Sequence, residues 1–240
     1  MIEINTNLEN NIDNLFDDFD KLNNINNTNN TNIFDILNKY NNIQQTLLNT
    51  YPNEIYTMLP YFSEHSFFSE NECHHINKIG YSQKLEYQKT VLDTVDLSVF
   101  NCKINSILPS QETNYIYDKI RQLINEINNK YWFFKIYEFA EPLKFIEYNE
   151  TFKGFVNLHS DLGNEGIFKF RKLTVIVQLS DENSYEGGDL ILQHYEKPCK
   201  MTRKRGSVII FPSFLLHKVE PVTKGIRNSL VIFAYGPPFC

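Results

Sequence analysis

The sequence of 240 residues is long enough to bury a substantial core, and 42% of its residues are hydrophobic. A formal net charge of −6 would repel a phosphate backbone, so nucleic acid is not an expected partner. The four cysteines stand far apart without a CxxC pair, which is typical of reduced thiols in an intracellular protein rather than of a disulfide framework.

The N-terminal residues lack both the basic start and the apolar run of a secretion signal, and no later stretch approaches a transmembrane length. We therefore expect a cytoplasmic protein that is not secreted and has no membrane partner. Residues 1–60 are expected to be an Asn-rich extension, partly helical, and residues 61–240 a single compact domain. Within the extension, residues 23–32 offer almost nothing apolar to bury and are predicted to be a disordered loop.

Two helices are predicted at the start of the compact domain. The first begins with a capping box, in which Ser69 is the N-cap and Glu72 follows three residues later, and it closes at Gly80. The second is predicted over residues 111–129, where isoleucine and leucine recur on one stripe that should pack against a sheet.

From Tyr131 onward the pattern changes to that of strands, starting with W-F-F-K-I-Y-E-F and L-K-F-I-E-Y. Further strands are predicted in R-K-L-T-V-I-V-Q-L, in D-L-I-L-Q, in R-G-S-V-I-I-F-P and in S-L-V-I-F-A-Y. Gly187 and Gly188 are expected to turn the chain sharply before the D-L-I-L-Q strand. The basic run that includes Arg203 and Arg205 is predicted to form a solvent-exposed face of the protein. The alternative is that it forms a small patch that binds acidic substrates.

A metal site is predicted in N-L-H-S-D-L and P-S-F-L-L-H-K-V. Side chains two apart in a strand share one face, so His159 and Asp161 can point at one ion, and His217 would complete the set. Two imidazoles and one carboxylate that leave the other face of the ion open suit a non-haem Fe(II) oxygenase. His74 and His75 are not expected to share a metal, because adjacent helical residues diverge by about 100°.

With these motifs, residues 60–240 resemble the Fe(II)/2-oxoglutarate dioxygenases, in particular the PKHD-type, prolyl 4-hydroxylase-like branch of prolyl and lysyl hydroxylases. The most specific part is the ending H-K-V-E-P-V-T-K-G-I-R. The resemblance implies an α+β fold, with a double-stranded β-helix (jelly-roll) core flanked by N-terminal helices. It also implies Fe(II), 2-oxoglutarate and dioxygen in the reaction, with ascorbate as a reductant.

Three residues receive roles toward 2-oxoglutarate from this resemblance. Arg227 would bind the distal carboxylate of 2-oxoglutarate. A planar guanidinium suits this role because it can donate two parallel hydrogen bonds to a carboxylate. Tyr148 would line the cosubstrate pocket, although it could equally be a core tyrosine at a strand end. Gln178 falls where relatives often bond the same carboxylate, and it could donate that bond here.

The expected reaction is hydroxylation of a prolyl or lysyl residue in a protein or peptide, with conversion of 2-oxoglutarate to succinate and CO2. The distal motif is more similar to prolyl enzymes, whereas the interval from Tyr148 to His159 is more similar to lysyl enzymes. The alternatives are an oxygenase of a small molecule or of nucleic acid, and a binding module without turnover. A nucleic-acid demethylase is disfavoured because no further Arg or Lys follows Arg227.

Overall fold

The computed structural model describes residues 59–88, 96–194 and 197–239. The chain divides into two units, Met1–Ile55 and Tyr56–Cys240, and every described residue belongs to the second. Almost all of the Asn-rich extension, including the predicted loop at residues 23–32, lies outside the described residues, so its boundary and its disorder stay predictions.

Two α-helices are described, α3 (Glu70–Gly80) and α4 (Asn114–Tyr131). Helix α3 begins as predicted, because the Ser69 side chain accepts a hydrogen bond from the Glu72 N–H while the Glu72 carboxylate accepts one from the Ser69 N–H. Helix α4 starts later than predicted, and its predicted apolar stripe is buried. Neither described helix combines the length and the apolar character that a bilayer crossing requires.

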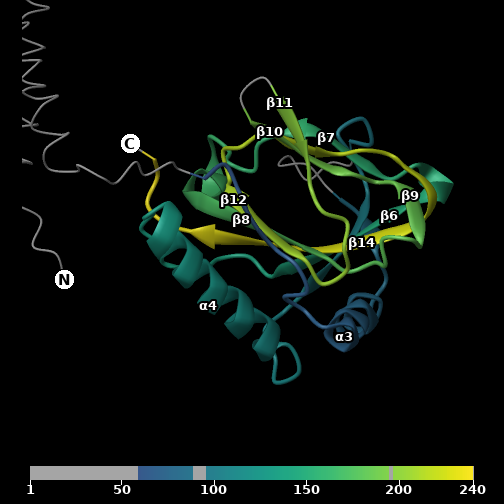
Figure 1. Cartoon of the computed structure of the whole chain (residues 1–240), viewed down its shortest axis with the longest axis horizontal. Helices are drawn as coiled ribbons and strands as arrows, with labels where there is room; N and C mark the ends of the chain where they lie inside the picture. The colour runs from purple at the N-terminus through teal and green to yellow at the C-terminus, as the bar shows by residue number, and fades with distance from the viewer. Residues whose placement is uncertain (1–58, 89–95, 195–196, 240) are drawn as a thin grey trace, which may run out of the picture. The chain divides into compact units, whose positions relative to one another are not determined.

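The described strands form two antiparallel sheets that face each other (Figure 1). The larger sheet is ordered β1-β12-β8-β14-β6-β4-β2, with β5 and β9 also paired to β14, and the smaller one is ordered β11-β10-β13-β7-β3. The strand bounds are β1 Phe62–Glu64, β2 Glu86–Tyr87, β3 Phe100–Asn101, β4 Lys103–Ile107, β5 Glu138–Phe139, β6 Leu143–Asn149, β7 Phe155–His159, β8 Arg171–Gln178, β9 Tyr185–Gly187, β10 Leu190–His194, β11 Lys197–Lys200, β12 Val208–Pro212, β13 His217–Val219 and β14 Val222–Tyr235. Two short 3-10 helices, η1 Glu150–Phe152 and η2 Gly166–Phe170, flank β7 and precede β8.

The two faces of the larger sheet bury different cores. On β8, Leu173, Val175 and Val177 pack in a cluster with α3 and α4, whereas Ile176 belongs to a second cluster with residues of β7, β10 and β13. Figure 1 shows the same arrangement, with α3 and α4 on one side of β14 and with β7, β10 and β11 on the other. Alternation along each strand therefore decides which side chains enter the space between the sheets.

The prediction that the barrel begins with a strand at Tyr131 is wrong. Tyr131 ends α4, residues 133–137 form no strand, and pairing resumes only in the short β5. The Asn128 side chain donates to the Phe134 carbonyl and accepts from the Phe134 N–H, and Phe133 has a positive φ of 55°. These contacts hold the aromatic run in an irregular connection, and the sheet instead starts earlier in the chain, with strands β1 to β4 that the sequence analysis did not predict.

The predicted turn at Gly187 and Gly188 is confirmed. Both residues have positive φ, of 73° and 64°. A side chain at position 187 would place its Cβ 2.2 Å from the Pro221 carbonyl oxygen, because β9 pairs with β14 there. Only glycine tolerates this combination of backbone angle and close approach.

The capping box yields a stability prediction. We expect Ser69→Ala to lower the free energy of unfolding by about 1 kcal/mol, whereas Ser69→Asp should keep most of it, because only the second change retains an acceptor for the Glu72 N–H. Urea denaturation followed by circular dichroism measures both variants. Equal midpoints for Ser69→Ala and the parent protein would show that the cap contributes nothing.

Candidate functional site

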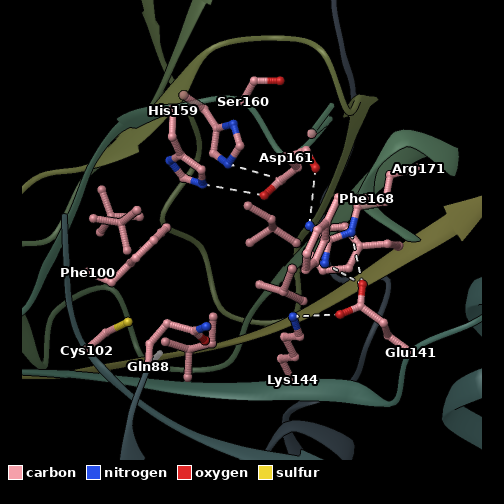
Figure 2. Close-up of a pocket in the computed structure, with 18 of the residues that line it drawn as sticks. Gln88, Phe100, Cys102, Glu141, Lys144, His159, Ser160, Asp161, Phe168 and Arg171 are labelled. Carbon is pink, nitrogen blue, oxygen red and sulfur yellow. Dashed lines mark hydrogen bonds and ion pairs between the residues drawn. The ribbon is translucent and has the colours of Figure 1, made fainter. Parts of the chain in front are cut away.

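A cavity of about 340 Å³ opens between the two sheets. Strands β6, β8 and β14 of the larger sheet and β7 and β13 of the smaller one contribute to its lining (Figure 2). Much of the wall is apolar, including Val156, Ile176, Val219 and Val231. Two groups of polar side chains interrupt this surface.

The first group is the predicted metal triad. His159 ends β7, Asp161 lies two residues beyond it, and His217 begins β13 directly opposite His159 in the strand register. Each residue offers one ligand atom, and these atoms lie within 4.8 Å of one another. The structure therefore brings the three predicted residues together, with Asp161 just beyond the end of the strand, and their assignment as iron ligands stays a prediction that this geometry fits.

Both imidazole rings are oriented by main-chain carbonyls. Nδ1 of His159 lies 2.8 Å from the Asn157 oxygen, and Nδ1 of His217 lies 3.0 Å from the Leu215 oxygen. A carbonyl can only accept, so each Nδ1 carries the proton and each Nε2 is left with its lone pair. The two Nε2 atoms point toward Asp161, at 3.4 Å from Oδ1 and 3.3 Å from Oδ2.

Asp161 is held in place by its own neighbours. The Thr174 hydroxyl donates to Asp161 Oδ2 at 2.8 Å, and Arg171 Nη1 donates to the Asp161 main-chain oxygen at 3.2 Å. Such contacts to a ligand residue fix its orientation before any metal binds.

The charge states of the triad also suit a metal. Burial by itself would raise the pKa of Asp161, but the two histidines and Arg171 outweigh it and hold that pKa well below its usual range. Burial lowers the pKa of His217 and would lower that of His159, whose pKa is nevertheless raised because Asp161 lies beside it. A metal needs an ionised carboxylate and a neutral imidazole, and these are the states favoured at Asp161 and His217.

Arg227 on β14 is buried without a carboxylate partner. Its side chain is among the largest that are fully buried, with a residue exposure of 1%. Nη2 donates to the Gln178 Oε1 at 2.9 Å, whereas Nε and Nη1 have no hydrogen-bond partner among the described residues. Leaving buried N–H groups of a cation unpaired is costly, so these two groups fit a ligand carboxylate.

Tyr148 and Gln178 surround this guanidinium. The Tyr148 ring centroid lies 4.9 Å from Arg227 Cζ, and β6 pairs Tyr148 with Arg227 in register. Burial raises the pKa of Tyr148, so its hydroxyl stays protonated and able to donate. Gln178 accepts from Arg227 and donates from Nε2 to the Thr202 carbonyl at 3.0 Å, which makes it a neutral support for the guanidinium.

Of the polar residues beyond the triad that the sequence singled out, Tyr148 lines the cavity, whereas Arg227, Gln178, His74 and His75 are not among its lining residues. His74 and His75 lie on α3, within 3.8 Å of Glu70 and 3.5 Å of Glu112 respectively. In the basic run, Arg205 forms an ion pair with Glu70, and Arg203 lies over the Tyr185 ring. Both side chains therefore contact neighbouring residues of the protein.

The second polar group in the cavity consists of Glu141, Lys144 and Arg171, which the sequence analysis did not identify. Figure 2 shows these side chains away from His159. The signal for Lys144 was available, because alternation in L-K-F-I-E-Y places it on the same face as Tyr148.

Comparison with known proteins finds a family model that matches part of the chain. Residues 143–235 match the family model described as the 2OG-Fe(II) oxygenase superfamily, which implies Fe(II) and 2-oxoglutarate. A PKHD-type hydroxylase of Stutzerimonas stutzeri is 40% identical over 55 residues, 23% of this chain and 24% of that protein. One of Alteromonas mediterranea is 44% identical over 59 residues, 25% of this chain and 26% of that protein. The chain thus matches about a quarter of the length of these relatives.

Solved structures agree on the fold. A Trichoplax adhaerens prolyl hydroxylase, in complex with a peptide fragment of hypoxia inducible factor, aligns with a TM-score of 0.63 at 16% identity, covering 87% of this chain and 96% of that one. A Pseudomonas putida prolyl-4-hydroxylase aligns with a TM-score of 0.60 at 17% identity, covering 80% and 98%. These alignments confirm the predicted jelly-roll fold.

The chain is thus similar to the 2OG-Fe(II) oxygenase superfamily over residues 143–235 and to PKHD-type hydroxylases over about a quarter of its length.

Proposed function

We propose that this protein is an Fe(II)- and 2-oxoglutarate-dependent dioxygenase that hydroxylates a prolyl or lysyl residue of a protein. The observation that carries the proposal is the presence, between the same two sheets, of a His-Asp-His triad and a fully buried arginine whose Nε and Nη1 lack partners in the described part of the chain. The triad suits Fe(II), and the arginine suits one end of a dicarboxylate.

His159, Asp161 and His217 would hold the iron, and Arg227 would hold the distal carboxylate of 2-oxoglutarate. Bound together, iron and 2-oxoglutarate supply the activation of dioxygen, in which one oxygen atom enters the C–H bond of the substrate and the other enters succinate as CO2 leaves. Ascorbate is included as a reductant that keeps the metal ferrous.

The chain's own residues position these groups. The main-chain carbonyls behind His159 and His217 present both Nε2 atoms, and Thr174 holds the Asp161 carboxylate. Gln178 fixes the Arg227 guanidinium, and the apolar wall around Ile176 limits the entry of water.

The protein substrate is supported by resemblance. The PKHD-type relatives are named as hydroxylases, and one structural neighbour was solved with a peptide fragment of hypoxia inducible factor. A polypeptide substrate in the cytoplasm is the proposal; a small-molecule or nucleic-acid oxygenase and a binding module without turnover are the alternatives.

The general test uses the protein with Fe(II), ascorbate, 2-oxoglutarate and a cytosolic peptide library. We expect succinate to form and a gain of one oxygen atom to map to proline or lysine by fragmentation mass spectrometry. Oxygen gained only by nucleobases or free small molecules would overturn the substrate class, and the absence of any succinate would favour the binding module.

The triad is tested by His217→Ala. Because the variant loses one of three ligands, we expect Fe(II) binding to fall sharply and 2-oxoglutarate turnover to be abolished, with the circular dichroism spectrum unchanged. His74→Ala, on the exposed face of α3, is the matched control and should keep full activity. Full turnover and full iron content in His217→Ala would refute the ligand assignment.

Arg227 is tested through the cosubstrate. Loss of a buried, charge-assisted contact costs about 2–5 kcal/mol, so Arg227→Gln should raise the KM for 2-oxoglutarate by about 30-fold or more while Fe(II) binding is retained. Arg121→Gln removes an arginine that pairs on the surface of α4 and serves as the control. An unchanged KM in a folded Arg227→Gln variant would mean that another group holds the carboxylate.

A further inference from the structure

The wall of the cavity away from the histidines carries a buried charge cluster of Glu141, Lys144 and Arg171 (Figure 2). Lys144 Nζ lies 2.9 Å from Glu141 Oε1, and Arg171 Nε donates to Glu141 Oε2 at 2.9 Å. The side chains of Glu141 and Lys144 are only 12% and 20% exposed, and Arg171 is more buried still. Solvent therefore screens these charges weakly.

The strand register separates this cluster from Arg227 along the larger sheet. Strand β6 pairs Tyr148 with Arg227 and Lys144 with Val231 on β14. Four residues of strand span about 13 Å, so Lys144 lies too far along the sheet to share a carboxylate with Arg227. A ligand at the Lys144 end is therefore separate from one held by Arg227, and the substrate is the ligand left to occupy it.

The cluster carries more positive than negative charge. Glu141 is the only carboxylate between the two cations, and both of its oxygens are already used, Oε1 by Lys144 and Oε2 by Arg171 and the Tyr235 hydroxyl. The other carboxylate among the described lining residues, Asp161, lies against the two histidines of the triad and under the proposed function would bind the iron. Within the described part of the wall, no carboxylate is left to pair with an incoming cation.

The two cations differ in their freedom to meet a ligand. Arg171 is fixed, because its guanidinium lies 3.6 Å from the Phe233 ring centroid and donates both to Glu141 and to the Asp161 main chain. Lys144 has three N–H donors, and its contact with Glu141 uses one of them. Lys144 can therefore donate to a carbonyl or a carboxylate, and it repels an ammonium.

We infer that Lys144 is a specificity-determining residue, which together with Arg171 selects a substrate whose target side chain is uncharged and rejects a lysyl ammonium. This inference rests on the proposed function and deepens it, because it ranks proline above lysine on the charges that line the cavity. Such selection depends on repulsion between the cations of the protein and the positive charge of the disfavoured lysyl substrate.

The test compares two peptides that differ only in their central residue, norleucine or lysine, so that the aliphatic length is nearly the same and the charge differs. Binding is measured by titration calorimetry at up to millimolar peptide, with the protein loaded with Fe(II) and 2-oxoglutarate in the absence of oxygen. We expect the lysine peptide to bind about tenfold or more weakly, although the net charge of −6 on the whole chain acts in the opposite direction.

The variant Lys144→Met removes the charge and keeps the aliphatic length. The ratio between the two peptides should then shrink several-fold or invert, because Glu141 loses one of its two cations. Lys224→Met is the matched control, since Lys224 also lies 2.9 Å from a carboxylate, that of Glu186, but on the exposed surface. It should leave the ratio unchanged, and Lys144→Gln replaces Lys144→Met if the latter does not fold.

Equal binding of the two peptides to the parent protein would overturn the inference. So would a preference for norleucine that survives the loss of Lys144, or the failure of either peptide to bind any variant. Because binding is measured without oxygen, a retained preference without succinate formation in air would contradict the proposed function alone.

Discussion

The pairing of β14 with β6 on one side and β8 on the other is the constraint on which the site depends. The register sets Arg227 opposite Tyr148 and sets Ser229 opposite Gln178, so that alternate side chains of three neighbouring strands project into one space. A slip of one residue would turn Arg227 toward the helices and bring Ile226 or Asn228 into its place. The apolar packing of the opposite face against α3 and α4 makes such a slip costly, since it would expose Leu230 and Ile232 to the cavity.

Arg171 links the two polar groups of the cavity. Its guanidinium donates to the main chain of Asp161 on one side and to the Glu141 carboxylate on the other, while it stacks on Phe233. One side chain therefore contacts both the main chain of the proposed metal ligand Asp161 and the charge cluster of the far wall. Removing Glu141 would leave Arg171 and Lys144 as two partly buried cations, which costs more than the ion pairs themselves contribute.

The sequence allowed the parts of this structure that depend on local pattern to be predicted. The HxD spacing predicted that His159 and Asp161 lie close together, although β7 ends at His159, and the spacing of Ser69 and Glu72 predicted the start of α3. The aromatic run after Tyr131 misled the prediction, because side-chain bonds from Asn128 override its strand propensity. The Glu141 cluster could not be predicted as a unit, since only Glu141 and Lys144 lie close together in the sequence, whereas Arg171 and Tyr235 reach Glu141 through the pairing of β8 with β14.

Arg227 and the Glu141 cluster are both basic, yet they are not equivalent for a dicarboxylate. Arg227 has a neutral partner in Gln178, so its full charge and two unpaired N–H groups remain for a ligand. Arg171 and Lys144 share Glu141, whose negative charge offsets part of theirs and repels a second anion, although Lys144 keeps two N–H donors for an uncharged acceptor. Under the proposed function, this asymmetry directs 2-oxoglutarate to the Arg227 end, past the His-Asp-His triad, and leaves the Lys144 end for the substrate. Glu141 therefore affects both ligands. Its charge weakens the binding of 2-oxoglutarate near Lys144, and its oxygens are already paired, so they offer no site for a lysyl ammonium of the substrate.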